Sequence, residues 1–219
     1  MTARLCVLVS GRGRNLRALH AACADGRIDG CITRVVCNQP QAAALEFAEQ
    51  AGIARRPLDH RGFATRADFD AALADAVEGS QPDWVILAGF MRVLGAPFVQ
   101  RFGGRMLNIH PSLLPRHRGL HTHRSALEAG DAEHGASVHF VTDELDGGPV
   151  VIQGACRVHP EDDEAGLAER VMSDIELRIY PQAVAWACAG RVQCRQSTVY
   201  FDGAPLRAPL DMTALEEGF

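Results

Sequence analysis

Short apolar runs alternate with helix-like segments along the first half of the chain. Apolar-rich runs at 4–9 and 85–88, the first of them nearly continuous, are typical of strands that are buried on both faces of a parallel sheet, and 32–37 predicts a further strand. Between them, residues 16–23 and 66–78 carry apolar side chains at helical spacing. This alternation predicts an α/β fold: a Rossmann-like, mostly parallel twisted sheet with helices on both faces.

Two end signals refine the prediction for this half. Thr65 is expected to be the N-cap of the helix over 66–78, because its hydroxyl can accept a hydrogen bond from a free backbone N–H. The apolar run 105–107 predicts a short buried strand that breaks into a loop at Asn108.

The second half predicts two more strands and two helices. Thr122 is expected to cap a short helix, and strands are expected over 135–141 and 149–158. A long helix over 163–189 is predicted to kink or restart at Pro181, which lacks a backbone N–H.

The C-terminal residues predict a small antiparallel edge. An Asp-Gly turn at 202–203 lies between short apolar runs, as in a β-hairpin. The chain has no internal repeat and no long linker, so residues 1–207 are predicted to form one domain. Residues 208–219 are expected to be a loosely ordered tail.

The composition of the 219 residues is that of an ordinary globular protein, with 47% hydrophobic and 22% charged residues. A net charge of -5 argues against a nucleic-acid-binding surface, and no apolar run approaches the roughly 18 residues of a membrane span. The seven cysteines contain no Cys-x-x-Cys pair, and the N-terminus leads directly into a strand. A cytoplasmic location without a signal peptide is therefore expected.

Lysine is absent, so all 22 basic residues are arginine. This excludes a Schiff-base lysine and the lysine of a P-loop. A bound phosphate or carboxylate must instead be held by arginine, by backbone N–H groups or by neutral donors.

A glycine-rich loop at 10–15, Ser-Gly-Arg-Gly-Arg-Asn, joins the first strand to the first helix. Such a loop aims free N–H groups and the positive end of a helix at an anion. Position 16 is leucine, so the dinucleotide fingerprint is incomplete and a single phosphate is favoured over NAD. A tight turn without a ligand is the alternative.

The candidate chemistry centres on residues 108–115, Asn-Ile-His-Pro-Ser-Leu-Leu-Pro. Asn108 and His110 are two positions apart, so they point to the same side of an extended chain. One supplies a neutral amide donor, and the other is an imidazole suited to proton transfer near neutral pH. They follow a buried strand, where open α/β sheets place their ligands. A rigid turn with a satisfied polar pair is the alternative.

This octet resembles the signature of the folate-dependent formyltransferases. Residues 143–149, Asp-Glu-Leu-Asp-Gly-Gly-Pro, resemble a second motif of that family, and 87–94 resemble its pterin-binding segment. The likeness extends over nearly the whole chain and is greatest to the glycinamide-type enzymes. It implies transfer of a formyl group from 10-formyltetrahydrofolate to the amine of glycinamide ribonucleotide, in purine biosynthesis.

The residues suit that reaction. An amine that attacks a formamide-like carbonyl forms a tetrahedral species with an oxyanion, which Asn108 and His110 are expected to stabilise. One such donor is worth on the order of 3 kcal/mol. His110 also donates a proton, while Asp146 accepts one and orients the imidazole. No covalent intermediate is required.

The resemblance also implies the binding residues. Two departures from the family are Arg14, where a serine is common, and Arg118, where a proline is frequent. For Arg66 and Glu176 a solvated charge is an equal alternative. The residues expected to bind glycinamide ribonucleotide are Gly11, Gly13, Arg14, Asn15 and Glu176, and those expected to bind folate are Arg66, Met91, Arg92, Val93, Leu94, Asn108, Thr142, Asp143, Glu144, Leu145 and Asp146.

No metal is expected, because His110, His117, His121 and His123 lack a carboxylate or cysteine that completes a compact ligand set. The expected partners are small molecules, with no nucleic acid and no membrane, and the chain is expected to be a monomer or a homodimer.

Three other functions remain open. Methionyl-tRNA formyltransferase and formyltetrahydrofolate deformylase share the Asn-His-Asp core. The first normally adds a C-terminal RNA-binding domain and the second an N-terminal regulatory domain, and the chain is expected to hold neither. A non-catalytic protein that binds folate or a nucleotide is the third.

Overall fold

The computed structural model describes residues 2–219, which form two compact units, the first ending at Asn108 and the second covering 109–219. The division falls inside strand β5 (Met106–His110), which contributes residues to both units. Each unit is described separately.

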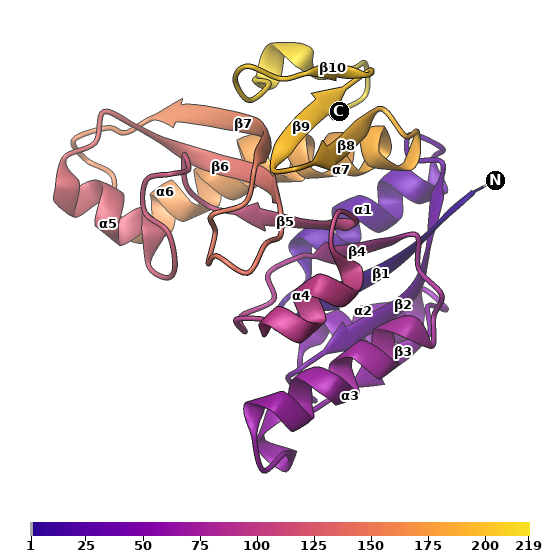
Figure 1. The fold of residues 1–219 in the computed structure, drawn as a ribbon. Helices are drawn as coiled ribbons and strands as arrows, with labels where there is room; N and C mark the ends of the chain where they lie inside the picture. The colour runs from indigo at the N-terminus through magenta and orange to yellow at the C-terminus, as the bar shows by residue number, and fades with distance from the viewer. Residues whose placement is uncertain (1) are drawn as a thin grey trace. The chain divides into compact units, whose positions relative to one another are not determined.

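The first unit is a parallel sheet with helices (Figure 1). Hydrogen-bonded neighbours follow the order β3-β2-β1-β4-β5, and every pairing is parallel. The apolar residues of β1 and β4 are buried, as expected for strands covered on both faces, whereas the short edge strand β3 is exposed. The other strands of this unit are β1 (Ala3–Val9), β2 (Gly30–Cys37), β3 (Arg55–Pro57) and β4 (Trp84–Leu87).

The helices of this unit form two groups. Helices α1 and α2 contact each other through His20 and Phe47, whose ring centres are 5.5 Å apart. Helices α3 and α4 lie in front of the strands in Figure 1. The predicted N-cap Thr65 is confirmed: its hydroxyl accepts from the N–H of Asp68, whose carboxylate accepts from the N–H of Thr65. The helices are α1 (Arg14–Ala24), α2 (Ala43–Gln50), α3 (Arg66–Glu78) and α4 (Ala96–Phe102), with a 3-10 turn η1 (His60–Gly62).

The second unit holds two antiparallel strand groups. Strands β6 (Glu133–Phe140) and β7 (Val150–Arg157) pair antiparallel and continue the order β5-β6-β7. The predicted C-terminal edge is a sheet of order β10-β9-β8, with a turn at Asp202 and Gly203. Its strands are β8 (Val192–Arg195), β9 (Thr198–Phe201) and β10 (Ala204–Pro205). The predicted α/β class with a mostly parallel sheet is confirmed.

The long C-terminal helix is interrupted earlier than predicted. It consists of α6 (Glu164–Val171), a π-helix η2 (Met172–Glu176) and α7 (Leu177–Cys188). Pro181 lies inside α7, so the prediction of a restart at this residue is wrong. The wider π turn places both Ile175 and Glu176 in buried positions, and a π turn inside a helix is typical of functional sites.

Two local predictions near the candidate site are also wrong. Strand β5 continues through His110, so Asn108 lies in the strand and not in a loop. Helix α5 (Thr122–Ala129) has His121 as its N-cap, with φ of 60°, and Thr122 is its first residue. The Thr122 hydroxyl is buried without a hydrogen-bond partner among residues 2–219.

The C-terminal segment makes specific contacts. Leu210 exchanges backbone hydrogen bonds with β7, and a 3-10 turn η3 (Met212–Ala214) follows. Glu216 accepts a hydrogen bond from the buried indole of Trp186 at 3.0 Å and pairs with Arg191. These contacts attach the segment to the strands and to α7, whereas the division into one domain and a tail stays a prediction.

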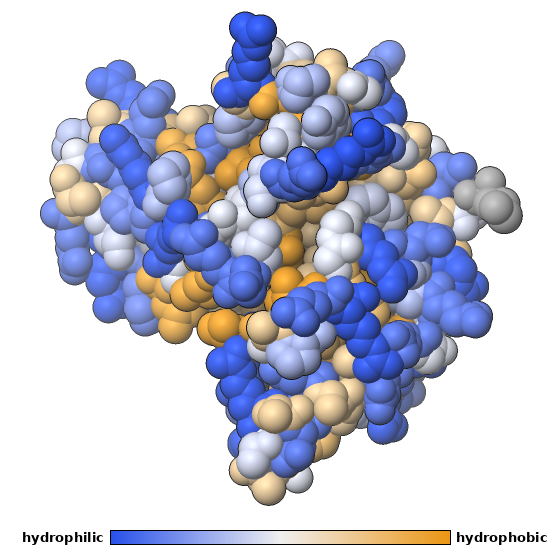
Figure 2. Space-filling model, in the orientation of Figure 1, coloured by the Kyte–Doolittle hydropathy of each residue, from blue (hydrophilic) through white to orange (hydrophobic). Residues whose placement is uncertain are grey.

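On the face drawn in Figure 2, hydrophilic side chains interrupt the apolar areas. Large hydrophobic side chains are exposed at few positions, and these are Met91, Val93, Leu120 and Leu145. Among residues 2–219, no helix combines the length and the apolar character needed to cross a membrane.

Candidate active site

Strand β5 positions the two polar residues of the octet. Alternation along the strand places Asn108 and His110 on the same face, as the sequence predicts. His110 is buried and Asn108 is half-buried. The backbone turns away directly after the strand, where the N–H of Ser112 donates to the carbonyl of His110 at 2.8 Å.

The ring of His110 lies between two acceptors. Its Nε2 is 2.9 Å from the carbonyl oxygen of His117, and its Nδ1 is 3.5 Å from Oδ2 of Asp146. A carbonyl only accepts, so Nε2 carries a hydrogen. A ring protonated on both nitrogens then presents one hydrogen to each partner, which is the form that can deliver a proton from Nδ1.

Asp146 is held by the backbone and faces a second histidine. Its Oδ2 accepts from the N–H of Gly119 at 2.9 Å, and its Oδ1 is 3.8 Å from Nε2 of His139. His139 donates through Nδ1 to the carbonyl of Phe140 at 2.9 Å, so the other nitrogen that faces Asp146 is unprotonated. Burial lowers the pKa of His139 to about 4, which keeps the ring neutral at pH 7.

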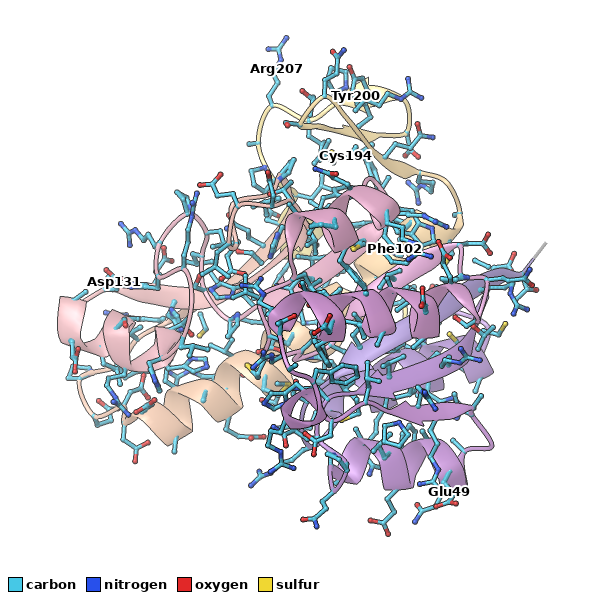
Figure 3. The ribbon with its side chains drawn as sticks, turned by 60° about the horizontal axis from the view of Figure 1, so that its bottom comes forward. Glu49, Phe102, Asp131, Cys194, Tyr200 and Arg207 are labelled. Carbon is cyan, nitrogen blue, oxygen red and sulfur yellow. The ribbon has the colours of Figure 1, made fainter. Side chains whose placement is uncertain are left out.

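Asp146 also lies at a cavity of the second unit with a volume of about 480 Å³. Arg118 contributes to its lining, as do Leu114, Pro115 and Gln153. Arg207 is at the rim and extends away from the three-stranded sheet (Figure 3). The carboxylate is therefore within reach of a small molecule.

The glycine-rich loop of the first unit leads into α1. Gly13 has φ of 74°, and a Cβ there would lie 2.9 Å from Cβ of Ala44, so glycine is required for both reasons. No side chain caps α1, and its first turn holds no acidic residue. The N-terminal end of this helix therefore carries uncompensated positive charge. Of the predicted phosphate residues, Gly11 is exposed, Arg14 is half-buried and Asn15 is buried.

Ser10 connects this loop to the segment 89–94. Its hydroxyl accepts from the N–H of Met91 at 2.7 Å and donates to the side-chain oxygen of Asn38 at 2.5 Å. Its own N–H donates to the carbonyl of Gly89 at 3.1 Å. The roles of Ser10 and Asn38 are not evident from the sequence, although both residues follow buried strands of the same sheet.

The predicted folate segment 91–94 is partly exposed. Met91 and Val93 are 64% and 49% exposed, whereas Leu94 is buried. Arg66 donates to the carbonyl of Val93 at 2.6 Å, so it supports this segment directly. The guanidinium of Arg92 lies 5.7 Å from the centre of the Phe69 ring.

The remaining predicted residues lie in the second unit. Thr142 and Glu144 contact each other, Leu145 is half-exposed, and Asp143 is exposed. Glu176 is buried at the last position of the π-helix. Within this unit the structure brings His110 and Asp146 together, and it adds His139 to them.

A histidine cluster lies next to this site. His134 contacts His123 at 3.0 Å, and His117 contacts Asp131 at 2.7 Å. Within residues 2–219, no three His, Cys, Asp or Glu side chains are placed to hold a metal ion. That the site works without a metal stays a prediction.

Comparisons with known proteins place this site in a family. Residues 3–184 match the model of a family described as formyl transferase. The chain belongs to the formyl transferase family.

The relatives define its position within that family. The chain is 47% identical over 202 residues to phosphoribosylglycinamide formyltransferase of Escherichia coli (strain K12), which covers 92% of this chain and 95% of that protein. It is 39% identical to the protein of that name from Haemophilus influenzae, over 93% of this chain and 95% of that one. The solved phosphoribosylglycinamide formyltransferase of Coxiella burnetii superposes with a TM-score of 0.91 at 40% identity, covering 96% of this chain and 99% of that one.

Proposed function

We infer that this chain is a phosphoribosylglycinamide formyltransferase. It transfers a formyl group from 10-formyltetrahydrofolate to the amine of glycinamide ribonucleotide, a step of purine biosynthesis. One observation carries this inference: His110, which lies two residues after Asn108, contacts Asp146. The chain that holds this contact is 47% identical to an enzyme of that name.

The proposed mechanism is direct attack. The substrate amine attacks the formyl carbon, and the oxyanion of the tetrahedral species accepts hydrogen bonds from Asn108 and His110. Asp146 accepts the proton that the amine loses, directly or through a water. His110 delivers a proton to the departing folate nitrogen. The contacts of both His110 nitrogens support this role, because they suit a doubly protonated ring.

The loop at 10–15 is proposed to bind the substrate phosphate. A phosphate on the N-terminal end of α1 gains from the helix dipole and from backbone N–H groups. Arg14 stands at the first position of that helix and provides the cation that the chain cannot take from lysine. Glu176 is proposed to hold the ribose or the glycinamide group.

The folate is proposed to contact exposed apolar side chains. A pterin is a flat heterocycle that needs apolar walls and backbone hydrogen bonds. Met91, Val93 and Leu145 are large, hydrophobic and about half or more exposed, which supports their assignment. The buried Leu94 supports the segment from beneath. The remaining folate residues of the sequence analysis keep their proposed roles.

The other expectations stay predictions. Small-molecule substrates are in line with the family, whereas a cytoplasmic location and the choice between monomer and homodimer have no support beyond composition and resemblance.

The test is a spectrophotometric formyl-transfer assay. Purified protein is mixed with 10-formyltetrahydrofolate, with and without glycinamide ribonucleotide. We expect folate product only when the amine is present. Product without the amine would identify a hydrolase, and no product in either mixture would refute the proposal.

The roles of the site residues need a separate measurement. Asp146→Asn should lower kcat by about 10²–10⁴-fold, because it removes the proton acceptor but keeps the size of the side chain. Folate binding, measured by fluorescence titration, should change much less. Asp174→Asn, at an exposed position on the π-helix, is the matched control. Equal turnover in both variants would contradict the assignment.

A further inference from the structure

One short segment contacts both proposed catalytic side chains. The carbonyl of His117 accepts from Nε2 of His110 at 2.9 Å, and the N–H of Gly119 donates to Oδ2 of Asp146 at 2.9 Å. Both contacts use backbone atoms. The conformation of 117–119 therefore fixes the orientation of the proposed acid and the proposed base together.

The backbone of this segment is unusual. His117 has φ of 49° and Gly119 has φ of 83°. Glycine tolerates this region, but for histidine it is unfavourable and persists only where other contacts enforce it. Side-chain contacts on both sides of the segment are therefore needed to keep the two backbone groups in place.

The side chain of His117 provides one of these contacts. Its Nε2 is 2.7 Å from Oδ2 of Asp131, which follows α5 and lies near the end of that helix in Figure 3. The hydrogen bond from His117 lowers the pKa of Asp131. This contact anchors the first residue of the segment.

Arg118 provides the other contact. Its NH1 pairs with Oε1 of Glu144, in the same loop as Asp146. Gly147 allows Glu144 to take this position, because a Cβ at 147 would lie 2.3 Å from Cδ of Glu144. The pair joins the loop that carries the base to the segment that orients both groups.

We propose that Arg118, through its ion pair with Glu144, is a positioning residue that holds 117–119 against His110 and Asp146. The proposal rests on the catalytic roles given to His110 and Asp146 under the proposed function. The guanidinium of Arg118 pairs with Glu144 and not with His110 or Asp146. Its effect should appear mainly in kcat, with little change in the KM for glycinamide ribonucleotide.

The expected size separates positioning from stability. Arg118 and Glu144 are 38% and 62% exposed, so their pair contributes little to the free energy of folding. Loss of the pair should shift Tm by at most about 3 °C. A misplacement of the acid and the base by a fraction of an ångström should lower kcat roughly 10-fold.

The test compares Arg118→Ala with Arg124→Ala. Arg124 is a matched control, because it also forms an exposed pair with a glutamate, Glu164, at 2.9 Å in the same unit. We expect a kcat lower by about 10-fold for Arg118→Ala and an unchanged kcat for Arg124→Ala. Equal values for the two variants would overturn the proposal.

Glu144 is also a proposed folate-binding residue, so its ion pair with Arg118 needs a test of its own. Exchanging the two charges provides that test. Arg118→Glu alone should lower kcat, and the double variant with Glu144→Arg should recover most of it. A double variant no better than Arg118→Glu would overturn the proposal, since the pair would then be irrelevant.

A readout without turnover separates this proposal from the proposed function. In ¹⁵N-histidine NMR spectra, assigned with His110→Asn, the ring signals of His110 should shift in Arg118→Ala and not in Arg124→Ala. An inactive wild-type protein with that shift would refute the proposed function alone. Unshifted signals in Arg118→Ala would overturn the positioning role.

Discussion

Buried His134 should make the protein less stable as the pH falls. Its side chain is 1% exposed and contacts His123 at 3.0 Å. Burial, together with the neighbouring His123 and His117, lowers the pKa of His134 from 6.5 to about 4. In the unfolded chain the ring takes up a proton near pH 6.5, whereas in the folded protein it stays neutral until about pH 4.

The sign and the size of the pH effect on the free energy of unfolding follow from this difference in pKa. The unfolded chain binds more protons between these two pH values, so stability is complete above pH 6.5 and is lost toward pH 4. At pH 5, proton binding by this histidine favours the unfolded chain over the folded protein by a factor of about 30, which corresponds to a loss of about 2 kcal/mol in the free energy of unfolding. His139, whose pKa is also lowered to about 4, should add a similar loss.

The assay is urea-induced unfolding at pH 7.5 and pH 5.0, followed by tryptophan fluorescence. His134→Gln keeps a polar side chain but cannot titrate, so it should reduce the loss between the two pH values by about 2 kcal/mol. His159→Gln, at an exposed position, is the control and should behave as wild type. An equal loss in His134→Gln and wild type would refute the reasoning.

Two further substitutions test stability at neutral pH. Thr65→Ala removes the hydroxyl that caps α3 and should lower the free energy of unfolding by about 1 kcal/mol; an unchanged urea midpoint would contradict this. Glu216→Ala leaves the buried indole N–H of Trp186 without its acceptor and should cost about 1–3 kcal/mol in the same assay. Wild-type stability in that variant would show that the segment after β10 is attached by other contacts.

The sequence could predict what depends on local pattern. Apolar-rich runs marked β1, β2 and β4 to within about two residues, because strands that are largely buried on both faces are mostly apolar. Thr65 marked the start of α3, because a threonine hydroxyl can cap a free backbone N–H.

Other features depend on contacts between distant residues. No local pattern in the sequence indicates that His121 has a positive φ. Likewise, no local pattern indicates that the last helix is interrupted at 172–176 instead of at Pro181. The contact of Ser10 with Met91 joins residues 81 positions apart.

The candidate site was predicted in part. Alternation in the octet correctly placed Asn108 and His110 on one face, and resemblance paired His110 with Asp146. The role of His139 was missed, although it lies in the predicted strand over 135–141, where it is buried. A buried histidine gives no sign in the sequence of which carboxylate it will face.

The π-helix has a consequence for how this gene can change. A π turn is an α-helix with one extra residue, and each residue corresponds to about 100° of rotation. A one-codon deletion between 172 and 176 would restore an ordinary α turn and leave α6 and α7 in register. Its cost would therefore fall on the two buried residues of the turn itself, Glu176 and Ile175, whose side chain fits against Gly154.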